Sequence, residues 1–247
     1  MTTPQQQKRK AKQQAALKAA LQAAEPWPVR MVYDHMQAHY GLQGWWPAES
    51  SFEMMLGAML VQNTTWIGAT RAIEALQHAG LDNPEGLRTA PDEAIEACIR
   101  PAGYFRQKRK RLQALAWFLA DYQDSCQLLF EMEGEGLRER LLGVYGVGEE
   151  TADSICCYEA KQPRFIVDSY TQRFFQRLGW LEAKWPYSHL QQAVEGKLPA
   201  DSELLGQFHG LIVHHCKVHC MAKPQCRGCP LSFCCASSPD GAPMDLV

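Results

Sequence analysis

Two segments of the sequence combine residue types that could carry out chemistry. In the first, Gly146 and Gly148 form a Gly-x-Gly turn between two apolar helical runs. A glycine turn that leads into a helix directs backbone N–H groups outward, an arrangement suited to holding a phosphate. Asp168 follows at the end of a short apolar run, 165–167, and just before another amphipathic segment. Such turns also occur without a ligand, and an aspartate can serve only as a helix N-cap. The turn and the carboxylate together nevertheless indicate chemistry on nucleic acid.

The second segment is rich in cysteine. Six of the ten cysteines lie in the last 32 residues, and four of them have the spacing Cys220-x5-Cys226-x2-Cys229-x5-Cys235. With no signal peptide a reducing compartment is expected, so clustered cysteines indicate a metal centre rather than disulfides. Zinc and a 4Fe-4S cluster both accept four thiolates. Zinc sites usually contain two close Cys-x-x-Cys pairs and only one is present here, so this spacing is unusual for zinc. Two alternative ligand assignments remain open: Cys234 could replace Cys235, and His219 is a minor alternative ligand.

The composition bounds the class of protein. The chain has 247 residues, of which 46% are apolar, and this is ample for a buried core. No apolar run approaches the roughly 20 residues that span a bilayer, so we expect a soluble, cytoplasmic protein without a membrane partner. Because the net charge is −2, a surface for a polyanion must come from local charge. The basic segments 8–12 and 106–111 supply it, and Lys108 is the candidate DNA contact, although a charge run is more often a solvated helix face.

The elements that must position these residues are predicted to be helices throughout. No strand pattern of convincing length is present, and Gly, Pro and the pair Asn83-Pro84 interrupt the helical runs. The expected fold class is therefore all-α. Residues 1–25 are expected to form a frayed helical extension, and 237–247 a disordered tail. Besides the two helices that flank the glycine turn, the pattern predicts helices over 29–40, 52–61, 67–79, 92–99, 104–122, 170–178, 188–194 and 203–218.

The glycine turn and Asp168 resemble the helix-hairpin-helix and Gly/Pro-Asp signature of the endonuclease III superfamily of DNA glycosylases. The resemblance implies that Gly146 and Gly148 are the hairpin glycines that contact DNA and that Asp168 is the catalytic aspartate. Bifunctional members carry a Schiff-base lysine two residues after the second hairpin glycine, and here that position is Glu150. Lyase activity is therefore expected to be absent or weak.

A second and longer match joins Trp45-Trp46-Pro47 to a buried-looking helix that ends in Gln62-Asn63-Thr64-Thr65-Trp66. This run resembles the endonuclease III-related 3-methyladenine DNA glycosylases. The resemblance implies that Gln62 enters the space left by a flipped nucleotide, and that Trp45 and Trp66 sandwich the extruded base. The implied base pocket comprises Trp45, Pro47, Trp66 and Glu150.

The resemblance also implies an architecture and a function. It implies two helical subdomains beside a DNA-binding cleft: 50–160, which ends in the hairpin, and 26–49 with 161–236, which carries an iron-sulfur loop. The cysteine spacing resembles the family loop, which is usually C-x6-C-x2-C-x5-C, although the first interval here is one residue short. This resemblance ranks a 4Fe-4S cluster ahead of zinc, and zinc ahead of no metal. The expected protein is a monomeric, nucleoid-associated glycosylase that hydrolytically removes an N-alkylated purine such as 3-methyladenine from double-stranded DNA. The alternatives are a glycosylase for oxidised pyrimidines or mispaired bases, and a non-catalytic iron-sulfur DNA-binding module.

Overall fold

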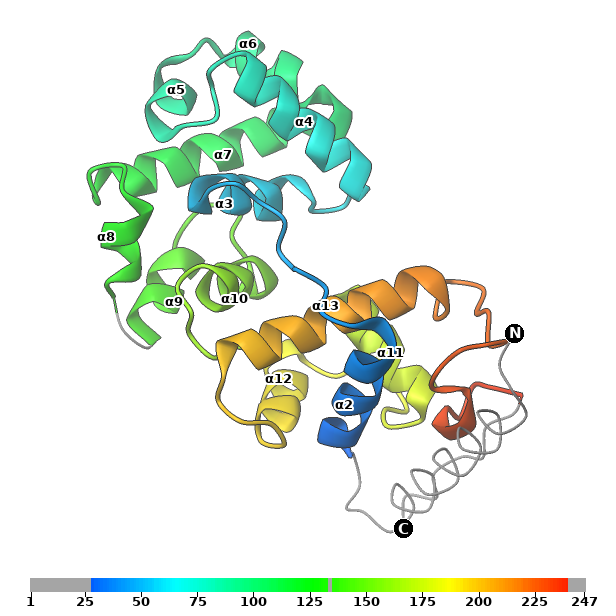
Figure 1. Cartoon of the computed structure of the whole chain (residues 1–247). Helices are drawn as coiled ribbons and strands as arrows, with labels where there is room; N and C mark the ends of the chain where they lie inside the picture. Colours follow the sequence, from blue (N-terminus) through cyan, green and yellow to red (C-terminus); the bar gives the residue numbers. More distant parts are fainter. Residues whose placement is uncertain (1–27, 133–134, 240–247) are drawn as a thin grey trace. The chain divides into compact units, whose positions relative to one another are not determined.

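The computed structural model describes residues 28–132 and 135–239, and every regular element within these ranges is a helix (Figure 1). The expected all-α class is thus confirmed for the described residues. The predicted extension at 1–25 and residues 240–247 of the predicted tail lie outside them. Among the described helices, none combines the length and apolar character needed to cross a membrane.

Residues 45–164 form one compact unit. Its central helix is α3 (Ser51–Leu60), eight of whose ten residues are buried. Helices α4, α7 and α10 pack against α3, which explains why this short segment is apolar on nearly every side. The other elements surround these. In chain order the unit contains α3, α4 (Trp66–His78), α5 (Pro84–Thr89), α6 (Asp92–Ile99), η1 (Arg100–Ala102), α7 (Phe105–Ala120), α8 (Cys126–Phe130), α9 (Glu135–Leu142) and α10 (Glu149–Tyr158).

The second unit joins residues 28–44 to residues 165–239. It contains α2 (Val29–Tyr40), α11 (Ser169–Leu178), α12 (Tyr187–Glu195), α13 (Ser202–Val218) and η2 (Ser232–Cys234). Helix α2, blue in Figure 1, packs against α13 although the two are far apart in the sequence. Phe208 of α13 lies at the centre of the core, where its ring meets those of Tyr33, Phe165 and Phe175 at centroid distances of 5.7, 5.6 and 6.5 Å.

The predicted helices agree with the observed ones to within about two residues at their ends, the usual uncertainty of a helix boundary. Two short helices, α5 and α8, were not predicted. The pair Asn83-Pro84 looks like a break in the sequence, but it begins α5. The Asn83 carboxamide oxygen accepts from the Gly86 N–H at 2.7 Å, and Pro84 occupies the first turn, where no N–H is needed.

Candidate functional site

The helix-hairpin-helix consists of α9, a turn and α10. At the turn, Gly146 has φ +91°, in the left-handed region that glycine adopts without strain. A Cβ at Gly146 would lie 2.3 Å from Cγ of Arg111, so a larger residue does not fit. Gly148 is the N-cap of α10 and is followed by Glu149 and Glu150 in the first helical turn. The exposed start of α10 therefore presents outward-facing N–H groups of the kind that bind anions.

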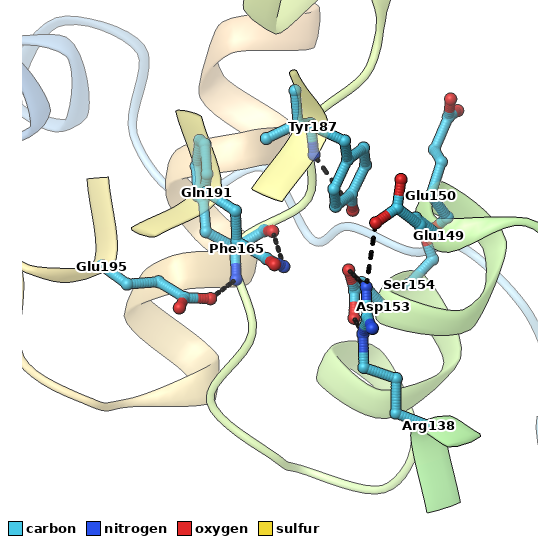
Figure 2. Close-up of polar contacts among 10 residues, drawn as sticks. Arg138, Glu149, Glu150, Asp153, Ser154, Phe165, Tyr187, Gln191 and Glu195 are labelled. Carbon is cyan, nitrogen blue, oxygen red and sulfur yellow. Dashed lines mark hydrogen bonds and ion pairs between the residues drawn. The ribbon is translucent and has the colours of Figure 1, made fainter. Parts of the chain in front are cut away.

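A buried ion pair fixes α9 against α10 (Figure 2). Arg138 Nε donates to Asp153 Oδ1 at 2.7 Å and its Nη2 donates to Oδ2 at 3.3 Å, while Asp153 itself is completely buried. Glu149 approaches the same guanidinium at 3.6 Å. The Glu150 side chain is exposed and extends away from this pair. A bidentate contact thus links the two helices of the hairpin.

Gln62 lies against the hairpin. Its Nε2 donates to the carbonyl of Gly146 at 3.1 Å and to Thr151 Oγ1 at 3.0 Å. Its Oε1 accepts a hydrogen bond from Arg111 Nη1. The structure therefore brings together Gln62, Gly146 and Arg111, of which the sequence predicted a role for the first two only.

Three tryptophans form a cluster that comprises Trp45, Trp46 and Trp66. The ring centroids of Trp45 and Trp66 are 5.2 Å apart, and Trp46 contacts both at 5.4 and 5.2 Å. All three are half-buried, and Pro47 beside them is exposed. The Trp46 ring also lies 3.2 Å from the position of a Cβ at Gly57, so it packs directly on the backbone of α3. The rings of Trp45 and Trp66 thus contact each other in this structure.

The position of Lys108 argues against the predicted contact with DNA. Lys108 is 1% exposed, and its Nζ donates to the carbonyls of Leu60 at 2.7 Å and Ala102 at 2.8 Å. Burial lowers the pKa of Lys108 to about 8, with a smaller contribution from Arg111. The residue therefore holds the end of α3 to η1. The basic run 106–111 lies within helix α7, so some of its cationic side chains face inward. Arg106 and Lys110 are the cationic residues of the run that are exposed.

Asp168 is the N-cap of α11. Its Oδ1 accepts from Thr171 N at 2.7 Å and from Thr171 Oγ1 at 2.9 Å, while its Oδ2 lies 3.5 Å from Nε2 of the buried His209. Burial raises the pKa of Asp168, but the interactions with His209 and Thr171 outweigh burial, so the pKa lies below its usual value. The capping role and an ionised carboxylate therefore coexist at this position. Sequence reasoning assigned no chemistry to His209, and only its proximity to Asp168 in the fold reveals the contact.

The four predicted cysteine ligands belong to the unit that contains Asp168, and none of the ten cysteines is in a disulfide. Cys220 accepts from Arg177 Nη1 at 3.4 Å, and hydrogen bonding with Cys216 followed by the Arg177 contact lowers the pKa of Cys220 to about 6. Burial raises the pKa of Cys229 to about 11, with the neighbouring thiols at 235, 226 and 220 adding to the effect. The donors are thus four thiols within electrostatic reach of one another, which fits an iron-sulfur cluster or zinc by type. In the described ranges, however, no three metal-binding side chains converge on one point.

Comparison with known proteins gives consistent matches. Residues 56–200 match the family described as HhH-GPD superfamily base excision DNA repair protein. A protein of Methanocaldococcus jannaschii, described provisionally as a DNA repair glycosylase, is 37% identical over 208 residues, covering 83% of this chain and 94% of its own length. Endonuclease III of Sulfolobus acidocaldarius is 27% identical over 187 residues, or 74% of this chain and 81% of that protein.

Two solved structures share the fold. The H. pylori 3-methyladenine DNA glycosylase bound to 1,N6-ethenoadenine matches with a TM-score of 0.67 and 27% identity, over 78% of this chain and 98% of that one. A non-covalent endonuclease III–DNA complex matches with a TM-score of 0.73 and 22% identity, over 87% of this chain and 96% of that one.

Proposed function

Since the chain belongs to the HhH-GPD superfamily of base excision DNA repair proteins and is a DNA glycosylase, we propose that it removes an N-alkylated purine such as 3-methyladenine. The observation that carries this substrate assignment is the cluster of Trp45, Trp46 and Trp66, three half-buried indole rings with centroids 5.2–5.4 Å apart. An H. pylori relative of 27% identity is a 3-methyladenine DNA glycosylase and supports the same assignment. We further propose that the substrate is double-stranded DNA and that the enzyme acts as a nucleoid-associated monomer.

The chemistry of the base explains the choice of tryptophan. An N3-alkylated adenine carries a delocalised positive charge, and an indole face attracts such a cation by about 0.5 to 2 kcal/mol more than it attracts a neutral base. In the proposed complex the extruded base enters between Trp45 and Trp66, beside Pro47 and Glu150. The same positive charge makes the base a good leaving group, so a modest catalytic site suffices.

Asp168 is the proposed catalytic residue. Its lowered pKa keeps the carboxylate ionised at neutral pH, the state in which it can stabilise a positively charged oxocarbenium-like sugar and accept a proton from the attacking water. Its Oδ1 is fixed by two hydrogen bonds from Thr171. This fixed carboxylate needs no rearrangement before the sugar develops charge.

Hydrolysis without strand cleavage is proposed because Glu150 takes the hairpin position at which an amine would be needed. An imine with the sugar requires an amine nucleophile, and the exposed Glu150 has none. The amides at the start of α10 are proposed to hold a phosphate near the lesion, while Gln62 fills the space left by the flipped nucleotide.

A 4Fe-4S cluster is the proposed cofactor, held by Cys220, Cys226, Cys229 and Cys235. When bound, the cluster supplies a rigid cross-link and a redox-active centre. Base removal as proposed needs no electron transfer. The proposed role of the cluster is therefore to stabilise the unit formed by residues 28–44 and 165–239. The alternative activity, removal of oxidised pyrimidines or mispaired bases, is favoured by the endonuclease III relatives at 25–27% identity.

A base-release assay on duplexes that each carry one defined lesion tests the proposal. The wild type should release 3-methyladenine faster than thymine glycol, and borohydride should trap no covalent complex with abasic DNA. Trp66→Phe should lower 3-methyladenine release slightly, and Trp66→Leu by about tenfold, the equivalent of about 1.4 kcal/mol. Trp117→Leu is the matched control, because Trp117 is 63% exposed on α7 and lies outside the proposed pocket.

Preferred release of thymine glycol would overturn the substrate assignment while leaving the family intact. Efficient borohydride trapping that is lost when Lys161 or another lysine is mutated would overturn the monofunctional mechanism. An equal loss of all activities in Trp66→Leu, together with unfolding, would assign Trp66 to the core.

A further inference from the structure

We propose that Arg111 is a positioning residue that joins Gln62 to the hairpin turn, so that nucleotide displacement and phosphate binding act as one preassembled unit. This inference rests on the proposed function of Gln62 and the hairpin. It gives a specific role to a residue that the sequence offers only as one charge in a basic run.

The first observation is that the Gln62 carboxamide is fully engaged. A carboxamide has two N–H donors and an acceptor oxygen. The two donors of Gln62 contact the Gly146 carbonyl and Thr151 Oγ1, at 3.1 and 3.0 Å, and the oxygen accepts from Arg111. Because guanidinium can only donate, its contact identifies the oxygen and fixes the orientation of the amide. Arg111 thus supplies the contact to the carboxamide oxygen, and it comes from α7 rather than from the hairpin.

The second observation is that Arg111 is itself seated in the hairpin. A Cβ at Gly146 would lie 2.3 Å from Arg111 Cγ and 2.5 Å from Arg111 Cδ. The aliphatic stem of Arg111 therefore occupies the space that glycine leaves open. One side chain therefore packs against the turn with its stem and holds Gln62 with its guanidinium. Displacement of the turn relative to Gln62 would disturb both contacts.

The third observation is the support from Lys108, which precedes Arg111 by one helical turn on α7. Its Nζ donates to the Leu60 carbonyl at 2.7 Å, close before Gln62 in the chain. Helix α7 thus holds the end of α3 with Lys108 and the Gln62 amide with Arg111. Side chains three residues apart lie on the same helix face, so Lys108 and Arg111 point inward together.

This arrangement predicts that Gln62 is ordered before DNA binds. Ordering a side chain at an interface costs conformational entropy, and this cost is avoided when the free protein already holds the side chain in place. Arginine suits the role better than lysine, since its planar fork reaches an acceptor in a fixed direction.

The test measures discrimination in binding, as the ratio of Kd for undamaged duplex to Kd for duplex with a stable abasic-site analogue. Arg111→Met keeps the stem and removes the guanidinium, and should lower this ratio by about tenfold. Gln62→Ala should lower it by a similar factor, and the double variant should show no further loss, as expected for two residues of one unit. A 2-aminopurine beside the analogue should show a smaller fluorescence increase in both single variants. Arg109→Met is the matched control, because it removes the same charge from α7 but its guanidinium pairs with Asp92 and Glu96.

The outcomes separate the two proposals. Loss of discrimination in Gln62→Ala but not in Arg111→Met overturns the role of Arg111 and leaves the proposed function in place. Unchanged discrimination in Gln62→Ala overturns both. If Arg111→Met unfolds, Arg111→Lys replaces it: this variant keeps charge and stem, and equality with the wild type would contradict the requirement for the guanidinium.

Discussion

Asp168 shows how one side chain can serve folding and chemistry together. Its Oδ1 caps α11 through Thr171, and its Oδ2 faces His209. An aspartate at a helix start is most often only a cap, and the sequence could not decide between the two roles. The burial of the carboxylate and its lowered pKa are properties of the fold, because they depend on a histidine some forty residues away in the sequence.

Asp168→Asn is therefore expected to abolish base release while leaving DNA binding nearly unchanged. Asparagine caps helices about as well as aspartate, so the bond from Thr171 N can persist without the charge. The folded pKa is below the unfolded value of about 3.9, so the ionised form stabilises the fold above that pH, and this contribution is lost as the pH falls through the lowered pKa. Single-turnover rates should be level from pH 6 to 8 as far as Asp168 is concerned. An acid limb centred above pH 5 would contradict this assignment of the pKa.

At the scale of elements, the helix starts were the most predictable feature and the inward or outward direction of charges the least. Ser50 and Asp201 both cap helices, accepting from Glu53 N at 3.1 Å and from Glu203 N at 2.8 Å, and both belong to the residue types that favour the N-cap. Lys108, in contrast, belongs to a run of cations whose pattern indicates a solvated surface. Which of these cations faces inward depends on where α3 and η1 end, and the local sequence does not contain that information.

The Arg138–Asp153 pair should be essential to the hairpin. Arg138→Met leaves a buried carboxylate without its counter-charge, and we expect it to lower the free energy of unfolding by about 3–5 kcal/mol. Arg140→Met, which removes an exposed arginine from the same helix, should change it by less than about 0.5 kcal/mol. Chemical denaturation measures both. Recovery of stability when Asp153→Leu is added to Arg138→Met would support the buried charge as the cause, whereas equal effects of the two single variants would contradict it.

For the whole molecule, the fold class was predictable because the described segments repeat the same helical periodicity. The composition of the units was harder to predict from local pattern, since α2 packs against α13 and so joins residues separated by most of the chain. The missed helices α5 and α8 have six and five residues. Each is too short for hydrophobic periodicity to register over the window that the pattern requires.

The proposed 4Fe-4S cluster can be tested on the intact protein by its colour and its iron content. Anaerobically purified protein should be brown and contain about four irons per chain. Cys226→Ser should lose iron and visible absorption, and Cys98→Ser, in the other unit, should retain both. Colourless protein with one zinc per chain would overturn the cluster but not the glycosylase assignment.

Because the rings of Trp45 and Trp66 contact each other, their mutual contact competes with the binding of a base between them. An aromatic pair of this kind is worth about 0.5–1.5 kcal/mol beyond its buried area, and a base that enters between rings with centroids 5.2 Å apart must first separate them. A neutral base replaces the lost ring contact only with stacking of similar energy, so its net binding energy is small. A cationic base gains about 0.5–2 kcal/mol more from cation–π attraction, which offsets the cost of separating the rings. Under the proposed pocket role, the closed rings would thus reject normal bases by self-association, and engineering them apart should broaden the substrate range before it raises the rate.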